Sequence, residues 1–284
     1  MASSNLSPPL VRLTRCVSFS SGHRYWISSL SEAENRALFG QWASPYNHGH
    51  NYLLEVEVVG VVDPVTGMVV NIKTIDDVLQ AVIVARFDQK SINDEIEHFH
   101  SRSSSTENLM LYIASVLQGG VLPKGVRLTG LKLHETDTLF GEYVEKDGSW
   151  TMTLTRIYEF AAAHRLHVPG MTEAQNVEMF GKCNNEAGHG HNYTLEVTVE
   201  GEPDPKTGMM VDLAAMDRIV DDLVVERYDH KHLNIDMPEF HDRAPTSEVI
   251  ATEIFRRLDG KLPAKLARVR LHETARSVFE VSRN

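Results

Sequence analysis

The chain has 284 residues, of which 42% are hydrophobic and 24% charged, and its formal net charge is −11. These values are typical of a globular protein, and the acidic balance argues against a nucleic-acid or anionic-membrane surface. No apolar run reaches the ~18–20 residues of a membrane helix, and the first residues lack the basic and apolar regions of a signal peptide. Two cysteines, Cys16 and Cys183, form no disulfide framework. We therefore expect a cytoplasmic protein.

After residues 1–10, a Ser- and Pro-rich stretch expected to be a disordered tail, the sequence is repeated at a spacing of 141 residues, which drops to 138 at the Leu-His-Glu-Thr segment near the end of each copy. His23-Arg24 returns as His164-Arg165, the run His48–Tyr52 as His189–Tyr193, and the turn Asp63–Met68 as Asp204–Met209. The period is far longer than a solenoid repeat and has the length of a domain. The sequence predicts two tandem copies of one fold, at 11–144 and 151–284, joined by the polar run 145–149.

Each copy reads as the same succession of elements. A strand, at 11–20 and at 152–161, leads to the first histidine, and a long loop follows before the His-x-His strand. A Pro- and Gly-containing turn precedes an amphipathic helix, and a second helix starts after a Ser or Thr cap, Ser105 or Thr246. Two strands close the copy. This order predicts an α+β fold, with a four-stranded antiparallel sheet and two helices on one face.

Three histidines in each copy form a candidate metal site. Residues two apart on a strand point to the same side, so each His-x-His pair presents two imidazoles together, and the upstream histidine supplies a third. Three imidazoles with an open fourth position are typical of catalytic zinc. The predicted ligands are His164, His189 and His191, with a second site at His23, His48 and His50. The remaining histidines, among them His98, His100, His167, His232 and His241, are interpreted as surface or hydrogen-bonded residues.

Cys183 allows two interpretations, a fourth structural metal ligand or a reactive thiol beside the metal. The first copy has Trp42 at the equivalent position but keeps its three histidines, which favours a reactive group outside the ligand set. Lys182 next to it would lower the pKa of such a thiol. Cys16 is expected to be buried in the core.

Two further positions carry titratable groups. Asp229-His230 is a candidate acid–base pair that the first copy replaces with Asp88-Gln89, so His230 and Cys183 are lost together. Glu273 and Glu135 each end a strand in a Leu-His-Glu-Thr sequence, where a carboxylate can accept paired N–H donors from a flat heterocycle or simply be solvated.

With these motifs in place, the second half resembles the 6-pyruvoyl-tetrahydropterin synthase family, whose members have the tunnelling fold (T-fold). The resemblance covers nearly all of 152–280, and a weaker one covers about 12–143. The segments that carry it are Phe160–Leu166, Cys183–Tyr193, Asp204–Met209, Tyr228–Leu233, Thr246–Glu248 and His272–Thr274.

The resemblance implies a zinc-dependent lyase that converts 7,8-dihydroneopterin triphosphate to 6-pyruvoyl-tetrahydropterin and triphosphate. Zinc would be held by the second-half histidines, with Cys183 as general base and Asp229-His230 completing the proton transfer. The residues implied in pterin binding are Glu273, Thr246, Ser247 and Glu248. The alternatives are 6-carboxy-tetrahydropterin synthase, which has a shorter spacing between the cysteine and His-x-His, and a pterin- or zinc-binding module without turnover.

For the first half, the same resemblance implies a zinc site without catalysis and a pterin contact through Glu135. The family forms hexamers of two stacked trimeric rings with sites at subunit interfaces. A tandem chain is therefore expected to assemble as a homotrimer, with second halves adjacent to one another.

Overall fold

The computed structural model describes residues 9–283, so the predicted tail lies largely outside the described residues. The chain forms two compact units. The first comprises the residues up to Leu154 together with Glu202–Met210, and the second comprises Thr155–Gly201 and the chain from Val211 onward. Within residues 9–283, no helix is both long and apolar enough to cross a membrane.

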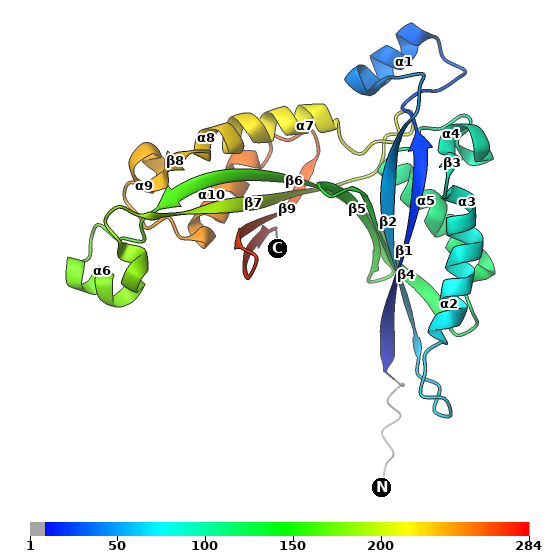
Figure 1. Cartoon of the computed structure of the whole chain (residues 1–284), viewed down its shortest axis with the longest axis horizontal. Helices are drawn as coiled ribbons and strands as arrows, with labels where there is room; N and C mark the ends of the chain where they lie inside the picture. The colour runs from blue at the N-terminus through cyan, green and yellow to red at the C-terminus, as the bar shows by residue number, and fades with distance from the viewer. Residues whose placement is uncertain (1–8, 284) are drawn as a thin grey trace. The chain divides into compact units, whose positions relative to one another are not determined.

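The first unit contains an antiparallel sheet with the strand order β5-β4-β2-β1. Its strands are β1 (Leu10–His23), β2 (His48–Val61), β4 (Val126–Thr136) and β5 (Leu139–Lys146). The two-residue strand β3 (Lys90–Ser91) adds to β1 in parallel. Helices α2, α3 and α5 lie on one side of this sheet (Figure 1).

The helical layer of the first unit is built from the predicted periodic segments. Helix α2 (Ile72–Leu79) continues through a π-helical turn, η2 (Gln80–Val84), into α3 (Ala85–Phe87). Helix α5 (Thr106–Val116) ends in η4 (Leu117–Val121). Between α3 and α5 the chain forms α4 (Ile92–Glu95) and η3 (Glu97–Phe99). The Ser105 side chain accepts a hydrogen bond from Asn108 N at 3.2 Å, which confirms the predicted helix cap.

The second unit repeats this plan with the strand order β10-β9-β7-β6. Its strands are β6 (Ser149–His164), which begins in the first unit, β7 (His189–Glu200), β9 (Lys265–Thr274) and β10 (Ser277–Ser282), with β8 (Lys231–His232) parallel to β6. The helices are α7 (Leu213–Val220), η6 (Asp221–Val225), α8 (Glu226–Tyr228), α9 (Leu233–Asp236), η7 (Pro238–Phe240) and α10 (Ser247–Leu258). The predicted α+β fold with two similar copies is confirmed.

The burial pattern of β1 corrects one prediction. Val17, Phe19 and His23 face the core, whereas Cys16 is exposed. Because side chains alternate along a strand, Cys16 belongs to the opposite face, and its assignment to the core was wrong.

The predicted long loops each contain a helix. These are α1 (Glu32–Phe39), followed by η1 (Gly40–Trp42), and α6 (Glu173–Phe180), followed by η5 (Gly181–Asn184). Both helices start with a capping box, from Ser31 and Glu34 in one and from Thr172 and Gln175 in the other. The Ser-x-x-Glu and Thr-x-x-Gln patterns were the sequence signal for these helices.

The polar run at 145–149 contains a tight turn between β5 and β6. Asp147 and Gly148 occupy positive φ values of 51° and 81° at its centre, as a two-residue hairpin turn requires.

Candidate active site

The second unit brings three histidines together where two strands meet. His164 ends β6, and His189 and His191 stand at the start of β7. One ligand atom from each ring lies within 4.8 Å of the other two, and His164 Nε2 is 3.2 Å from His189 Nε2. The two-residue period of β7 aims both of its imidazoles at the end of β6.

The protonation states of these rings suit a metal. His164 Nδ1 lies 2.8 Å from the carbonyl oxygen of Pro245, so this nitrogen donates its hydrogen and leaves the Nε2 lone pair free. Burial lowers the pKa of His164 and His189, and the neighbouring imidazoles lower it further. His191 Nε2 is buried without a hydrogen-bond partner among residues 9–283. Converging imidazoles with free lone pairs are the donor set that zinc prefers, so these residues fit the metal.

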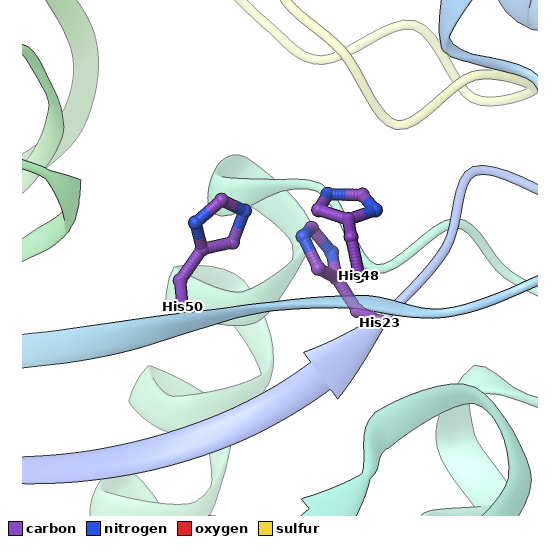
Figure 2. A group of neighbouring side chains, drawn as sticks. All are labelled: His23, His48 and His50. Atoms are coloured by element: carbon purple, nitrogen blue, oxygen red, sulfur yellow. The ribbon is translucent and has the colours of Figure 1, made fainter.

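The first unit repeats the cluster, as Figure 2 shows for His23, His48 and His50. His23 is completely buried, and its Nδ1 lies 3.0 Å from the carbonyl oxygen of Ser104. Burial, reinforced by the two neighbouring rings, lowers the pKa of His23 to about 3. Nε2 of His23 has no hydrogen-bond partner in the described part of the chain. The donor set is the same as in the second unit.

Glu273 lies beside the second histidine cluster. Its Oε1 is 3.8 Å from His191 Nε2 and 3.9 Å from His164 Nε2, and it accepts a hydrogen bond of 2.7 Å from Ser247 Oγ. The neighbouring Thr246 caps α10, while Glu248 is exposed. The structure therefore brings Glu273 and Ser247 to the histidines and leaves Glu248 facing outward.

In the first unit Glu135 occupies the equivalent position. Its Oε1 lies 3.5 Å from His50 Nε2, and its other oxygen accepts a hydrogen bond from the Thr106 hydroxyl. Glu135 is only 6% exposed.

The Asp229-His230 pair forms the link between α8 and β8. Asp229 Oδ1 accepts a hydrogen bond of 2.7 Å from Ala161 N, and its Oδ2 lies 2.6 Å from His230 Nδ1. The bond from Ala161, followed by the contact with His230, lowers the pKa of Asp229. An ionised carboxylate only accepts, so Nδ1 of the imidazole carries the hydrogen and Nε2 is left as an acceptor.

The backbone of this link is unusual and is shared by both copies. His230 has φ = 56° and its N–H donates to Ala161 O at 2.6 Å. Gln89 has φ = 58° and its N–H donates to Ser20 O at 2.7 Å. The left-handed conformation therefore does not depend on the imidazole, and the copies differ in the side chain alone.

A cavity of about 510 Å³ in the second unit is lined by residues of β6, β7 and the segment around β8. Its wall includes His191, His230 and His232. His232 was interpreted from the sequence as a surface or hydrogen-bonded residue, and its place in this wall was missed. The available signal was the comparison of copies, because the first copy has Ser91 at the equivalent position, just as it has Gln89 for His230.

Cys183 lies in η5, where its backbone carbonyl accepts a hydrogen bond of 3.0 Å from Leu166 N. Its side chain is half-buried, and Cys183 is not among the described residues that line the 510 Å³ cavity. The structure thus brings together the three histidines, Glu273 and Ser247. Of the candidate catalytic and metal-binding residues of the second unit, His191 and His230 lie in the cavity wall, and the wall includes neither Cys183 nor Glu273.

Comparison with known proteins identifies the family. The family model for 6-pyruvoyl tetrahydropterin synthase matches residues 12–146 and again 153–284. The chain belongs to the 6-pyruvoyl tetrahydropterin synthase family. It is 42% identical over 128 residues to the 6-pyruvoyl tetrahydrobiopterin synthase of Drosophila melanogaster, a match that covers 44% of this chain and 76% of the relative. The human protein of the same name is 40% identical over 126 residues, covering 44% of this chain and 87% of the relative.

The solved structure of the Caenorhabditis elegans 6-pyruvoyl tetrahydropterin synthase is also similar, with 39% sequence identity. The match covers 47% of this chain and 96% of that one, with a TM-score of 0.45. Membership of the family confirms the resemblance seen in the motifs, the tandem duplication and the T-fold. It also confirms the enzyme class, a lyase of the 6-pyruvoyl tetrahydropterin synthase type. The 6-carboxy alternative is not favoured, since the relatives are named for the pyruvoyl product.

Proposed function

We propose that the second unit converts 7,8-dihydroneopterin triphosphate to 6-pyruvoyl-tetrahydropterin, with elimination of triphosphate, in a zinc-dependent reaction. The observation that carries this proposal is the arrangement of His164, His189 and His191 with Glu273 less than 4 Å from two of the three rings. A metal site and a carboxylate for the heterocycle thus lie side by side. Family membership supports the reaction type.

The three histidines of the second unit would hold the zinc ion through their neutral imidazoles. Bound there, zinc supplies Lewis acidity to a substrate hydroxyl or carbonyl oxygen. The hydrogen bond from His164 Nδ1 to Pro245 O fixes the direction of that ring and keeps its Nε2 available.

Glu273 would anchor the pterin ring by accepting its adjacent N–H donors. Two coplanar N–H groups on one carboxylate give both affinity and direction, because charge-assisted bonds are stronger than neutral ones. The hydroxyl of Ser247 orients this carboxylate through its 2.7 Å bond to Oε1. Thr246 and Glu248 complete the proposed binding set at the start of α10.

Asp229 and His230 would carry protons. The carboxylate holds Nδ1 of the ring, so Nε2 is the atom that takes up a proton and gives it back. His230 is exposed on 84% of its side chain, which leaves that nitrogen accessible to a substrate or to a neighbouring chain.

Cys183 is proposed as the general base that removes a carbon-bound proton from the substrate side chain, which requires the thiolate form. The family is expected to share its proton-transfer groups between neighbouring subunits, so the Asp229-His230 pair that works with Cys183 is proposed to come from another chain. Such sharing requires second halves to be adjacent, and we propose a homotrimer on that basis.

For the first unit we propose zinc binding through His23, His48 and His50 without turnover, with Glu135 as the carboxylate for a pterin. The acid–base groups are replaced by Gln89 and Trp42, so the site can bind but lacks the proton carriers. The domain boundaries 11–144 and 151–284 belong to the same proposal.

The test is product analysis from dihydroneopterin triphosphate, with the wild type and Cys183→Ala compared at equal zinc content. We expect 6-pyruvoyl-tetrahydropterin and triphosphate from the wild type, and a loss of 10²-fold or more in the variant, the effect typical of removing a general base. Equal product formation by the two proteins would contradict the role of the thiol, and a different pterin product would contradict the reaction.

A further inference from the structure

The helical layer of the first unit contains a cavity that shares no lining residue with either histidine cluster. Its volume is about 590 Å³, in the range of sites that hold small molecules. Residues of α3, α4, η3 and α5 line it, together with the segment before α5 (Figure 1). The charged and aromatic residues of this wall are Arg86, Glu95, Glu97, His98, Arg102 and Tyr112.

Two arginines of this wall are not neutralised by a carboxylate. Arg86 donates a hydrogen bond to the Tyr112 hydroxyl, and its guanidinium lies 5.7 Å from the centre of that ring. Arg102 donates a hydrogen bond of 3.3 Å to the backbone carbonyl oxygen of His98. Both acceptors are uncharged, and neither arginine forms an ion pair with any residue between 9 and 283. The two guanidinium groups are therefore available to an anion.

The second unit shows how the same place is closed when a carboxylate is present. Arg227 is the counterpart of Arg86, and it forms a bidentate pair with Glu239 at 2.9 Å and 2.7 Å. The first unit has His98 at the position of Glu239. The arginine is thus common to both copies, whereas its internal anion is found in the second copy alone.

An aromatic surface takes the place of the second unit's carboxylates. Tyr112 stands at the position of Glu253, whose carboxylate pairs with Arg256 at 2.6 Å. The ring centroids of His98 and Tyr112 lie 4.6 Å apart. Partial burial, and then the charge of Arg102, lowers the pKa of His98, so the cavity presents a neutral imidazole beside two permanent cations.

The two carboxylates of the wall differ in their surroundings. Glu95 is already satisfied, because it accepts hydrogen bonds from Lys90 Nζ at 2.8 Å and from Ser91 N at 2.9 Å. Glu97 is exposed and accepts no hydrogen bond from the described residues. The second unit has Pro238 at its position. The first unit has therefore gained an acceptor in this wall and lost the internal partner of its arginine.

We propose that this cavity binds a small phosphomonoester, with its phosphate on Arg86 and Arg102 and a hydroxyl of its organic part on Glu97. Two guanidinium groups match the double negative charge and the paired oxygens of a phosphate, and a local pair of cations can bind an anion in an acidic chain. The volume leaves room for more than the phosphate group, and the rings of His98 and Tyr112 offer an apolar surface to the rest.

Phenylglyoxal modification of the full-length protein tests this site, because the reagent attacks free guanidinium groups and a bound phosphate protects them. Peptide mass spectrometry follows each arginine separately at rising glycerol 3-phosphate, with chloride holding the ionic strength constant. Arg36, which pairs with Glu32 on α1 outside the cavity, is the internal control. We expect saturable protection of Arg86 and Arg102 and no change at Arg36.

Two variants keep the test independent of any one substitution. His98→Glu supplies the carboxylate that closes the second unit, and the residues before η3 and η7 share their backbone angles, φ −113° and ψ 105° at Ile96 against −111° and 105° at Met237. We expect Arg86 to lose its probe-dependent protection in this variant. Arg102→Gln should raise the concentration that half-protects Arg86 by about tenfold or more, the effect of one charge-assisted hydrogen bond.

Inorganic phosphate distinguishes an organic ligand from the bare anion. Glycerol 3-phosphate should protect at lower concentrations than inorganic phosphate, because only the ester has an organic part that extends to Glu97. Equal protection by the two probes would contradict that contact. The proposal is overturned if glycerol 3-phosphate protects Arg36 as strongly as Arg86, or if the protection of Arg86 is the same in the wild type, His98→Glu and Arg102→Gln.

Discussion

Replacing His230 with glutamine gives the second unit the residue that the first unit has at the equivalent position, Gln89. Gln89 occupies the same left-handed conformation, with φ = 58° against 56° for His230, and makes the same backbone bond to the neighbouring strand. The substitution therefore removes the imidazole without forcing a new backbone, and the exposed side chain leaves no cavity. The fold and the zinc content should not change.

The expected loss is catalytic. A positioned acid–base group contributes typically 10²–10⁴-fold to a rate, which corresponds to about 3–5 kcal/mol of transition-state stabilisation. We expect His230→Gln to lower kcat by this factor and to change KM little, because Glu273 and the histidines are untouched.

The assay is release of triphosphate from dihydroneopterin triphosphate under saturating substrate, with metal content and thermal midpoint measured on the same preparation. Asp229→Asn is the matched variant, since it keeps an oxygen for the Ala161 amide but no longer enforces the Nδ1–H tautomer. A kcat for His230→Gln within about threefold of the wild type, far below the usual contribution of such a group, would refute the role of His230.

Further predictions concern the metal, the assembly and a buried acid. Metal analysis should find close to two zinc ions per chain and about one in His164→Ala, as expected for two three-histidine sites; a single ion in the wild type, lost in that variant, would contradict the first site. Light scattering should give a trimer, and a monomer would rule out the proposed assembly. Burial raises the pKa of Glu107 from 4.5 to about 7, so the stability present below pH 4.5 is lost as the pH rises through 7. Glu107→Gln keeps an acceptor for Met210 N and should exceed the wild type by about 3 kcal/mol in urea unfolding at pH 8.5, with no difference at pH 4.5; equal pH profiles would show that Glu107 ionises normally.

The sequence was most informative where a short-range rule decides the geometry. The His-x-His pairs are brought together by the period of a strand, and the caps at Ser105 and Thr246 depend on hydrogen bonds three residues away. Comparing the two copies separated two groups of residues, because Cys183 and His230 are replaced together in the first copy while the three histidines are kept. Those inferences required no knowledge of long-range packing.

The sequence failed where the outcome depends on distant partners. Cys16 was placed on the wrong face of β1, because the phase of a strand is set by what packs against it. His232 reaches the cavity because β8 pairs with β6 some seventy positions earlier in the chain, a pairing of two residues with no local signal. The packing of Glu202–Met210 in the first unit was equally invisible to a reading of local patterns.

The left-handed link at Gln89 has a consequence for the history and the engineering of the first unit. The backbone conformation that presents the His230 ring in the second unit is also present at Gln89, held by the bonds from Ser20 to Asp88 and from Gln89 to Ser20. Three substitutions, Trp42→Cys, Gln89→His and Ser91→His, would give the first unit the cysteine and the two histidines that the second unit has at these positions. In a chain with two such copies, substitutions in the first copy can be selected for a new specificity while the residues of the second copy stay unchanged.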